Sequence, residues 1–160
     1  MAKSFRDKID KKIIKPILGF LKQGMTPTKL ALSISLGFCF GLFPIVGITT
    51  LLCLVAAFIF KLNLAAIQLI NYIVYPLQLI ILIPLIHLGS NALGVNPIPY
   101  SIQEVINLIN SDWLQAFKLL WKATLMGMFA WLITIVPISF IGFFILRSVF
   151  LKLAGTSSGD

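Results

Sequence analysis

Hydrophobic residues along this chain gather in long blocks that contain no charge. Such blocks lie between Lys29 and Lys61, between Lys61 and Glu104, and between Lys122 and Arg147. A helix that crosses a membrane needs about 20 apolar residues in succession, and each block is long enough to supply them. The pattern therefore predicts an all-α integral membrane protein.

The first block, 30–60, carries helix-breaking residues at its centre, namely Gly41, Pro44 and Gly47. A proline has no amide hydrogen and clashes with the preceding turn, so we expect one helix to end before it and another to begin after it. Each half is about 20 Å long, which is shorter than the hydrocarbon core of about 30 Å. We predict a re-entrant helical hairpin over 28–60. The alternative is a block that crosses fully as a broken helix.

The second block predicts a transmembrane helix over 64–88 with a polar stripe on one face. Gln68, Asn71, Tyr75 and Gln78 recur at steps of three and four residues, which places them on one side of a helix. Unsatisfied amides in lipid cost several kcal/mol each, so the stripe should face protein or water. Two interpretations stay open: a ligand site, or hydrogen bonds that only hold the helices together.

Small residues and prolines indicate where helices approach closely or break. Ser33, Gly37 and Gly41 are four residues apart, and such a ridge lets another helix come near to the backbone. Pro44 is the predicted helix break, and Pro76 should free backbone carbonyls inside the polar stripe.

The remaining blocks predict a short interfacial helix followed by a second transmembrane helix. Ser101 opens a capping-box pattern before the interfacial helix over 100–110, and Asp112 is a suitable cap for the transmembrane helix over 113–147. We expect 154–160 to be a flexible tail.

The N-terminal residues 1–24 predict an amphipathic basic helix that precedes the membrane domain, 25–153. Its apolar positions recur at helical steps while lysines occupy the other faces, as in helices that lie on an anionic membrane surface. Packing on a partner protein is the alternative. The lysines expected to contact anionic lipid headgroups are Lys8, Lys11, Lys12 and Lys15.

Composition and charge agree with a membrane location. Hydrophobic residues make up 59% of the chain and charged residues 11%, whereas a soluble domain has about 25% charged residues. The net charge of +8 would suggest a nucleic-acid partner in a soluble protein, but eight of the thirteen Lys and Arg lie within residues 1–29. A basic segment beside a membrane block is explained by lipid headgroups and by orientation. We expect no nucleic-acid partner and expect both termini to be cytoplasmic.

This sequence contains few residues that could carry out catalysis. There is one His and there are five acidic residues, and no carboxylate pair, nucleophile triad or metal-ligand cluster lies in the membrane blocks. Cys39 and Cys53 lie in the first block without a Cys-x-x-Cys pattern, so we interpret them as small apolar packing residues. We expect no enzyme activity, no cofactor and no metal.

Several short motifs follow one another along the first half of the chain. They are Gly-Met-Thr-Pro at 24–27, Gly-Leu-Phe-Pro-Ile-Val-Gly at 41–47 and Leu-Asn-Leu at 62–64, followed by Asn71 and Pro76. In this order they resemble a known bacterial family, the domain of unknown function 2062. The resemblance implies a small polytopic protein of the bacterial inner membrane, in a family whose domain is sometimes joined to a glycosyltransferase. The resemblance supplies no activity.

Two hypotheses for function follow. The second half of the hairpin begins inside the membrane, and free amides at a helix N-terminus suit an anion such as a lipid phosphate. The chain would then handle or translocate a lipid or a small anionic solute. The alternative is a non-transporting anchor or assembly subunit for a cytoplasmic partner such as a glycosyltransferase, and a second copy of the chain is a further partner to consider. The candidate ligand-binding residues are Gly47, Thr49, Thr50, Asn71 and Gln78.

Overall fold

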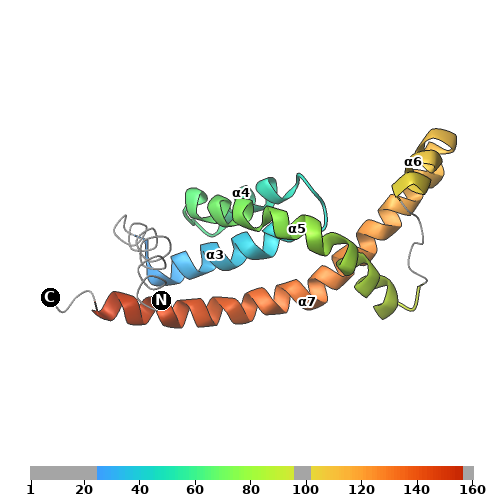
Figure 1. The fold of residues 1–160 in the computed structure, drawn as a ribbon. Coiled ribbons are helices and arrows are strands. Elements are labelled where there is room, and N and C mark those ends of the chain that lie inside the picture. The colour runs from blue at the N-terminus through green and yellow to red at the C-terminus, as the bar shows by residue number, and fades with distance from the viewer. Residues whose placement is uncertain (1–24, 96–101, 157–160) are drawn as a thin grey trace, which may run out of the picture.

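The computed structural model describes residues 25–95 and 102–156, which form helices and no strands (Figure 1). This confirms the predicted all-α fold. The predicted surface helix over 1–24, with Lys8, Lys11, Lys12 and Lys15, lies outside the described residues. The helices are α3 (Pro27–Gly41), α4 (Thr49–Ile59), α5 (Leu64–Ala92), α6 (Ile102–Ser111) and α7 (Trp113–Thr156).

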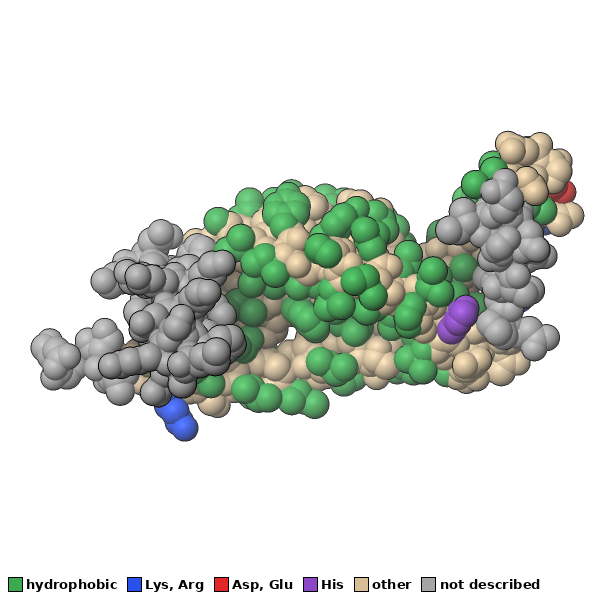
Figure 2. Space-filling model, viewed as in Figure 1, with side chains coloured by type: hydrophobic (Ala, Val, Ile, Leu, Met, Phe, Trp, Pro, Cys, Tyr) green, Lys and Arg blue, Asp and Glu red, His purple; other side chains and the backbone are tan. Residues whose placement is uncertain are grey.

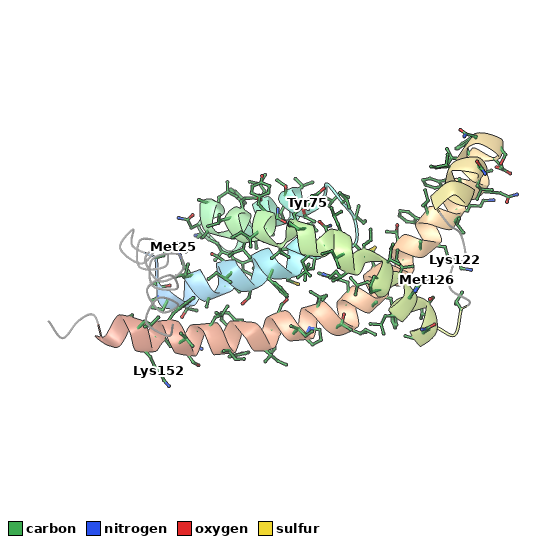
Figure 3. The ribbon with its side chains drawn as sticks, in the orientation of Figure 1. Met25, Tyr75, Lys122, Met126 and Lys152 are labelled. Carbon is green, nitrogen blue, oxygen red and sulfur yellow. The ribbon has the colours of Figure 1, made fainter. Side chains whose placement is uncertain are left out.

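Helix α7 is the longest helix, and three of the other described helices pack against it. It packs against both α3 and α5, while α4 packs against α3 and α5 and α6 packs against α7. In Figure 1, α3 and α4 run in opposite directions and are joined by a turn part-way along the molecule. Met25 and Lys152 lie at one end, and Lys122 lies towards the other (Figure 3).

Side-chain caps explain where three helices begin. The hydroxyl of Thr26 accepts a hydrogen bond from the Lys29 amide at the start of α3, with Pro27 in the first turn. The Asn63 side chain accepts one from Ala66 at the start of α5. Each of these caps satisfies an amide that has no partner inside the helix. At the start of α7, the Asp112 carboxylate accepts hydrogen bonds from the amides of Leu114 and Gln115.

Within the described residues, two helices are long and apolar enough to cross a membrane, Leu64–Ala92 and Trp113–Ala154. Only 22% and 17% of their most apolar windows are buried inside the molecule, whereas a core helix of a soluble protein would be mostly buried. Figure 2 shows the resulting hydrophobic side chains spread over much of the visible surface. Among the described residues, this is far more exposed apolar surface than soluble monomers carry.

Both predicted transmembrane helices end later than we expected. The predicted helix over 64–88 continues to Ala92. The helix predicted over 113–147 continues to Thr156, so 154–156 are helical and do not belong to a flexible tail. The prediction ended the first of these helices where a polar stretch begins at Gly89, and the second at the charged residue Arg147, but such a change in composition does not by itself end a helix.

Contacts at the two ends stabilise these extra turns. Gly89 lies against the backbone of Met126 where α5 crosses α7. Phe150 is buried in a cluster with Leu30 and Ala31 of α3. Local sequence does not reveal either contact, since each joins segments that are far apart in the chain.

The predicted break in the first block is confirmed. Two short helices, α3 and α4, flank a non-helical segment, 42–48, where one helix of 28–60 would have continued. The short helix expected over 100–110 is α6, displaced by one or two residues. The helices α5 and α7 continue through their prolines, Pro76 and Pro84 in α5 and Pro137 in α7.

Candidate functional site

The segment between α3 and α4 turns the chain back on itself. Gly47 has φ +92°, a left-handed conformation that is strained for a residue with a side chain. A Cβ atom at Gly47 would have no atom within 4 Å. Backbone conformation, and not lack of space, therefore accounts for glycine at this position.

Helix α4 begins without a side-chain cap. Its N-cap residue is Ile48, which makes no side-chain hydrogen bond to the helix, whereas Thr26, Asn63 and Asp112 cap α3, α5 and α7. The first amides of a helix have no partner within the helix. The start of α4 therefore offers backbone donors and the positive end of the helix dipole to its surroundings.

A pocket of about 240 Å³ lies beside this helix start. One wall comes from the turn and the first residues of α4, and the other comes from α5. Figure 3 shows Tyr75 beside the turn. The lining residues are Val46, Gly47, Thr49, Thr50, Asn71, Tyr72 and Tyr75.

The polar stripe of α5 holds the start of α4 through a chain of hydrogen bonds. The Gln68 side-chain amide donates to the backbone oxygen of Thr50 at 2.9 Å. The Asn71 side-chain amide donates to Gln68 Oε1 at 3.2 Å and to Thr50 Oγ1 at 3.4 Å. Gln68 and Asn71 therefore face protein, as the stripe predicted, whereas Tyr75 of the same stripe is exposed.

Two further donors satisfy carbonyls at the helix break. The Gln78 side-chain amide donates to the backbone oxygen of Phe43 at 2.6 Å. The Trp131 indole donates to the backbone oxygen of Cys39 at 2.9 Å, and its ring meets Phe43 edge-on at 5.1 Å between centroids. The proline at 44 interrupts the helical hydrogen bonds here, and side chains of α5 and α7 replace them.

Two buried amide oxygens remain without a hydrogen-bond partner among the described residues, Asn71 Oδ1 and Gln78 Oε1. Asn71 is 2% exposed and Gln78 is 1% exposed. Because the backbone oxygens of Phe43 and Thr50 can only accept, Gln78 and Gln68 must present their NH₂ groups to them. Gln68 then offers its oxygen to Asn71, so the free atom of Asn71 is also an oxygen.

Gly37 and Gly41 of the predicted small-residue ridge lie where α3 meets α5. A Cβ atom at Gly37 would lie 2.7 Å from the Ile67 carbonyl oxygen, and one at Gly41 would lie 3.3 Å from Asn71 Oδ1. Both glycines therefore let α3 approach the backbone of α5. Ser33 is fully buried, and its hydroxyl donates to the Lys29 backbone oxygen of its own helix at 2.9 Å.

The structure brings most of the predicted ligand-binding residues together, but not all of them. Gly47, Thr49, Thr50 and Asn71 line one pocket, whereas Gln78 does not line it and contacts Phe43 at the other end of the turn. The sequence did not identify Tyr72 or Trp131 as residues of this region. Tyr72 lies off the polar stripe of α5, and Trp131 is distant in sequence from Cys39, to which it donates. No group of three or more His, Cys, Asp or Glu suited to a metal ion occurs in the part of the chain that the structure describes.

Comparison with known proteins gives one match. A family model described as "Uncharacterized protein conserved in bacteria (DUF2062)" matches residues 12–156. No curated protein matches the chain, and no solved structure matches it.

Proposed function

This chain belongs to the uncharacterised bacterial family DUF2062, and we propose that it is a multi-pass protein of the bacterial inner membrane. We propose further that it handles or translocates an anionic lipid, or a small anion, at the turn between α3 and α4. The membrane location is supported by the length of α5 and α7 and by their apolar, exposed surfaces. With both helices crossing, Lys29, Lys61 and Lys152 lie at one end and Lys122 near the other. The preference of basic residues for the cytoplasm puts both termini there.

The re-entrant arrangement is supported by helix length. Helix α3 has 15 residues and α4 has 11, so they are about 22 Å and 16 Å long. Neither spans a hydrocarbon core of about 30 Å. Phe43 contacts Gln78, which lies about 21 Å along α5 from its start at Leu64. The turn is then inside the membrane, where non-helical backbone is tolerated only against protein or water.

The observation that carries the anion proposal is the uncapped start of α4 in a pocket that Thr49, Thr50 and Asn71 help to line. Backbone amides at a helix N-terminus, together with the helix dipole, form a binding site for phosphate and carboxylate groups. The hydroxyls of Thr49 and Thr50 add donors beside them. Discontinuous helices near the bilayer midplane supply such sites in transporters.

Asn71 lines the same pocket, but its unpaired oxygen lies on the side of α3, where a Cβ atom at Gly41 would be 3.3 Å from it. The contacts that we propose for an anionic headgroup are therefore with the free amides of α4 and with the hydroxyls of Thr49 and Thr50.

Mass spectrometry of lipids that co-purify with the protein tests this function. We expect the wild-type protein to retain anionic phospholipid, and expect Thr50→Val with Asn71→Leu to lose that enrichment about tenfold or more. Thr124→Val is the control, because the Thr124 hydroxyl donates only to its own helix and lies outside the pocket. An identical lipid profile in all three proteins, each folded, would contradict the proposal.

The alternative function, an anchor for a cytoplasmic partner such as a glycosyltransferase, has less support. It depends on the basic residues 1–24, which lie outside the described residues. We propose no catalytic role, because the pocket contains hydroxyl and amide groups but no His, Cys, Asp or Glu.

A further inference from the structure

The contact between α3 and α7 is closed at both ends and hollow in the middle. At one end Leu30 and Ala31 pack against Phe150. Towards the other end, Leu42 packs with Ala130 of α7 in the central cluster. Between these two contacts, a pocket of about 240 Å³ is lined by α3 and α7, and one of about 330 Å³ is lined by α3 and α7 together with Ile70, Ile73 and Val74 of α5. In Figure 2 a hollow is visible between α7 and the helices above it.

The two pockets meet at a pair of serines. Ser35 of α3 and Ser139 of α7 line both of them, so we treat the pockets as one feature, the α3–α7 slot. Apart from these serines its walls are almost wholly apolar. Gly142 lines the larger pocket, and a Cβ atom there would have no atom within 4 Å, so space is left open at this point.

Ser35 and Ser139 differ from several other hydroxyl residues of these helices. Ser33, Thr134 and Ser148 each donate to the backbone oxygen four residues earlier, as hydroxyls in membrane helices commonly do. Among the described residues the hydroxyl of Ser35 has no hydrogen-bond partner, and that of Ser139 meets only the thiol of Cys39, a weak partner. Both residues are more than nine-tenths buried. A buried hydroxyl left unpaired costs about 1–3 kcal/mol.

We propose that the α3–α7 slot binds the acyl chain of a membrane lipid, with the ester carbonyl of that chain accepting hydrogen bonds from Ser35 and Ser139. An apolar cavity of about 150 Å³ already takes up a molecule such as benzene, and each pocket of the slot is larger. Both serines line both pockets, and one carbonyl oxygen, with its two lone pairs, can accept a hydrogen bond from each of them.

The position of the slot fits a lipid entering from the cytoplasmic leaflet. Ser35 lies about 9 Å along α3 from Lys29, and Ser139 lies about 12 Å along α7 from Arg147. At the depth of these two serines, the slot is therefore surrounded by the hydrocarbon of the bilayer. This inference rests on the membrane location in the proposed function, but not on the anion site beside α4.

Photo-crosslinking with phosphatidylcholine that carries a diazirine in its acyl chain tests the slot. This lipid has no net charge, so the test does not depend on anion binding. With the full-length protein in vesicles of this lipid, we expect labelled peptides from 32–39 and 136–143. Gly142→Leu, which fills the open space, should lower labelling at least fivefold, while the matched control Gly142→Ala should leave it unchanged.

The two serine hydroxyls are tested separately, so that the result does not depend only on Gly142→Leu, the variant that fills the slot. Ser35→Ala and Ser139→Ala should each weaken labelling about fivefold, the change expected for a net hydrogen bond of about 1 kcal/mol, and Ser148→Ala should not. Even labelling along all exposed faces of α7, or equal labelling in Gly142→Leu and Gly142→Ala, would overturn the slot. Release of the wild-type protein from membranes by alkaline carbonate would instead contradict the membrane location.

Discussion

At the scale of single residues, this chain compensates for a broken helix with side-chain donors from distant helices. The break at 42–48 leaves backbone oxygens without helical partners, and Gln78 and Trp131 donate to two of those near it, on Phe43 and Cys39. Such groups cannot be left unsatisfied in an apolar environment. The side-chain amide of Gln78 therefore has a structural role. Asn71 donates a hydrogen bond to Thr50 and also lines the pocket.

Replacing Gln78 with leucine tests the structural role. Gln78→Leu leaves the buried oxygen of Phe43 without its donor, and we expect a loss of about 1–3 kcal/mol in stability, measured as a lower Tm in detergent. Gln115→Leu is the control, because the Gln115 side chain is exposed on α7. Equal Tm values for the two variants would show that the Phe43 oxygen finds another donor.

The sequence predicted part of this residue-level picture. It identified Asn71 and Gln78 as inward-facing because a polar amide in a membrane helix has few other places to go. It did not separate them into two sites, since three-residue and four-residue steps place them on one face without saying what lies opposite each one. That depends on where α3 ends, which is at Gly41 in the folded structure.

At the scale of helices, glycines set how closely the elements approach. Gly37 and Gly41 admit α5 beside α3, and both were recognised from their spacing. Gly89 and Gly127 were not, because each is isolated in its own helix. Yet Gly127 faces Pro44 of the turn, where a Cβ atom would lie 3.1 Å from the proline ring, and Gly89 faces the backbone of Met126.

A pair of alanine substitutions tests the crossing of α5 and α7. A Cβ atom at Gly89 would overlap the Met126 backbone, which cannot rotate away as a side chain can. We expect Gly89→Ala to lower stability by about 1–3 kcal/mol, as overpacking does, with a lower Tm in detergent. Gly142→Ala makes the same chemical change in α7 with no atom within 4 Å. A Tm for Gly89→Ala at or above that of Gly142→Ala would mean that the two helices do not cross this closely.

At the scale of the whole molecule, the sequence predicted which segments are apolar helices but not how far each extends. Long apolar runs predicted α5 and α7, and the Pro/Gly cluster predicted the break between α3 and α4. The last turns of α7 depend on Phe150 packing against α3, which no local pattern indicates. The α3–α7 slot likewise depends on the relative placement of two helices, so a serine at 35 or at 139 alone carries no signal.

The orientation of these helices in the membrane is the last prediction, because both proposed sites depend on it. In a protein with Cys39→Ala and Cys53→Ala, we introduce single cysteines as Lys29→Cys, Lys61→Cys and Lys118→Cys. An impermeant thiol reagent should label the cysteine at 118 from the periplasmic side of spheroplasts, and those at 29 and 61 only in inverted vesicles. The reason is length, since α3 and α4 are each shorter than about 30 Å of hydrocarbon. Labelling of 29 and 61 from opposite sides would mean that the segment crosses as a broken helix. The start of α4 would then point towards one membrane face, and the anion site would lie on a continuous path between the two faces.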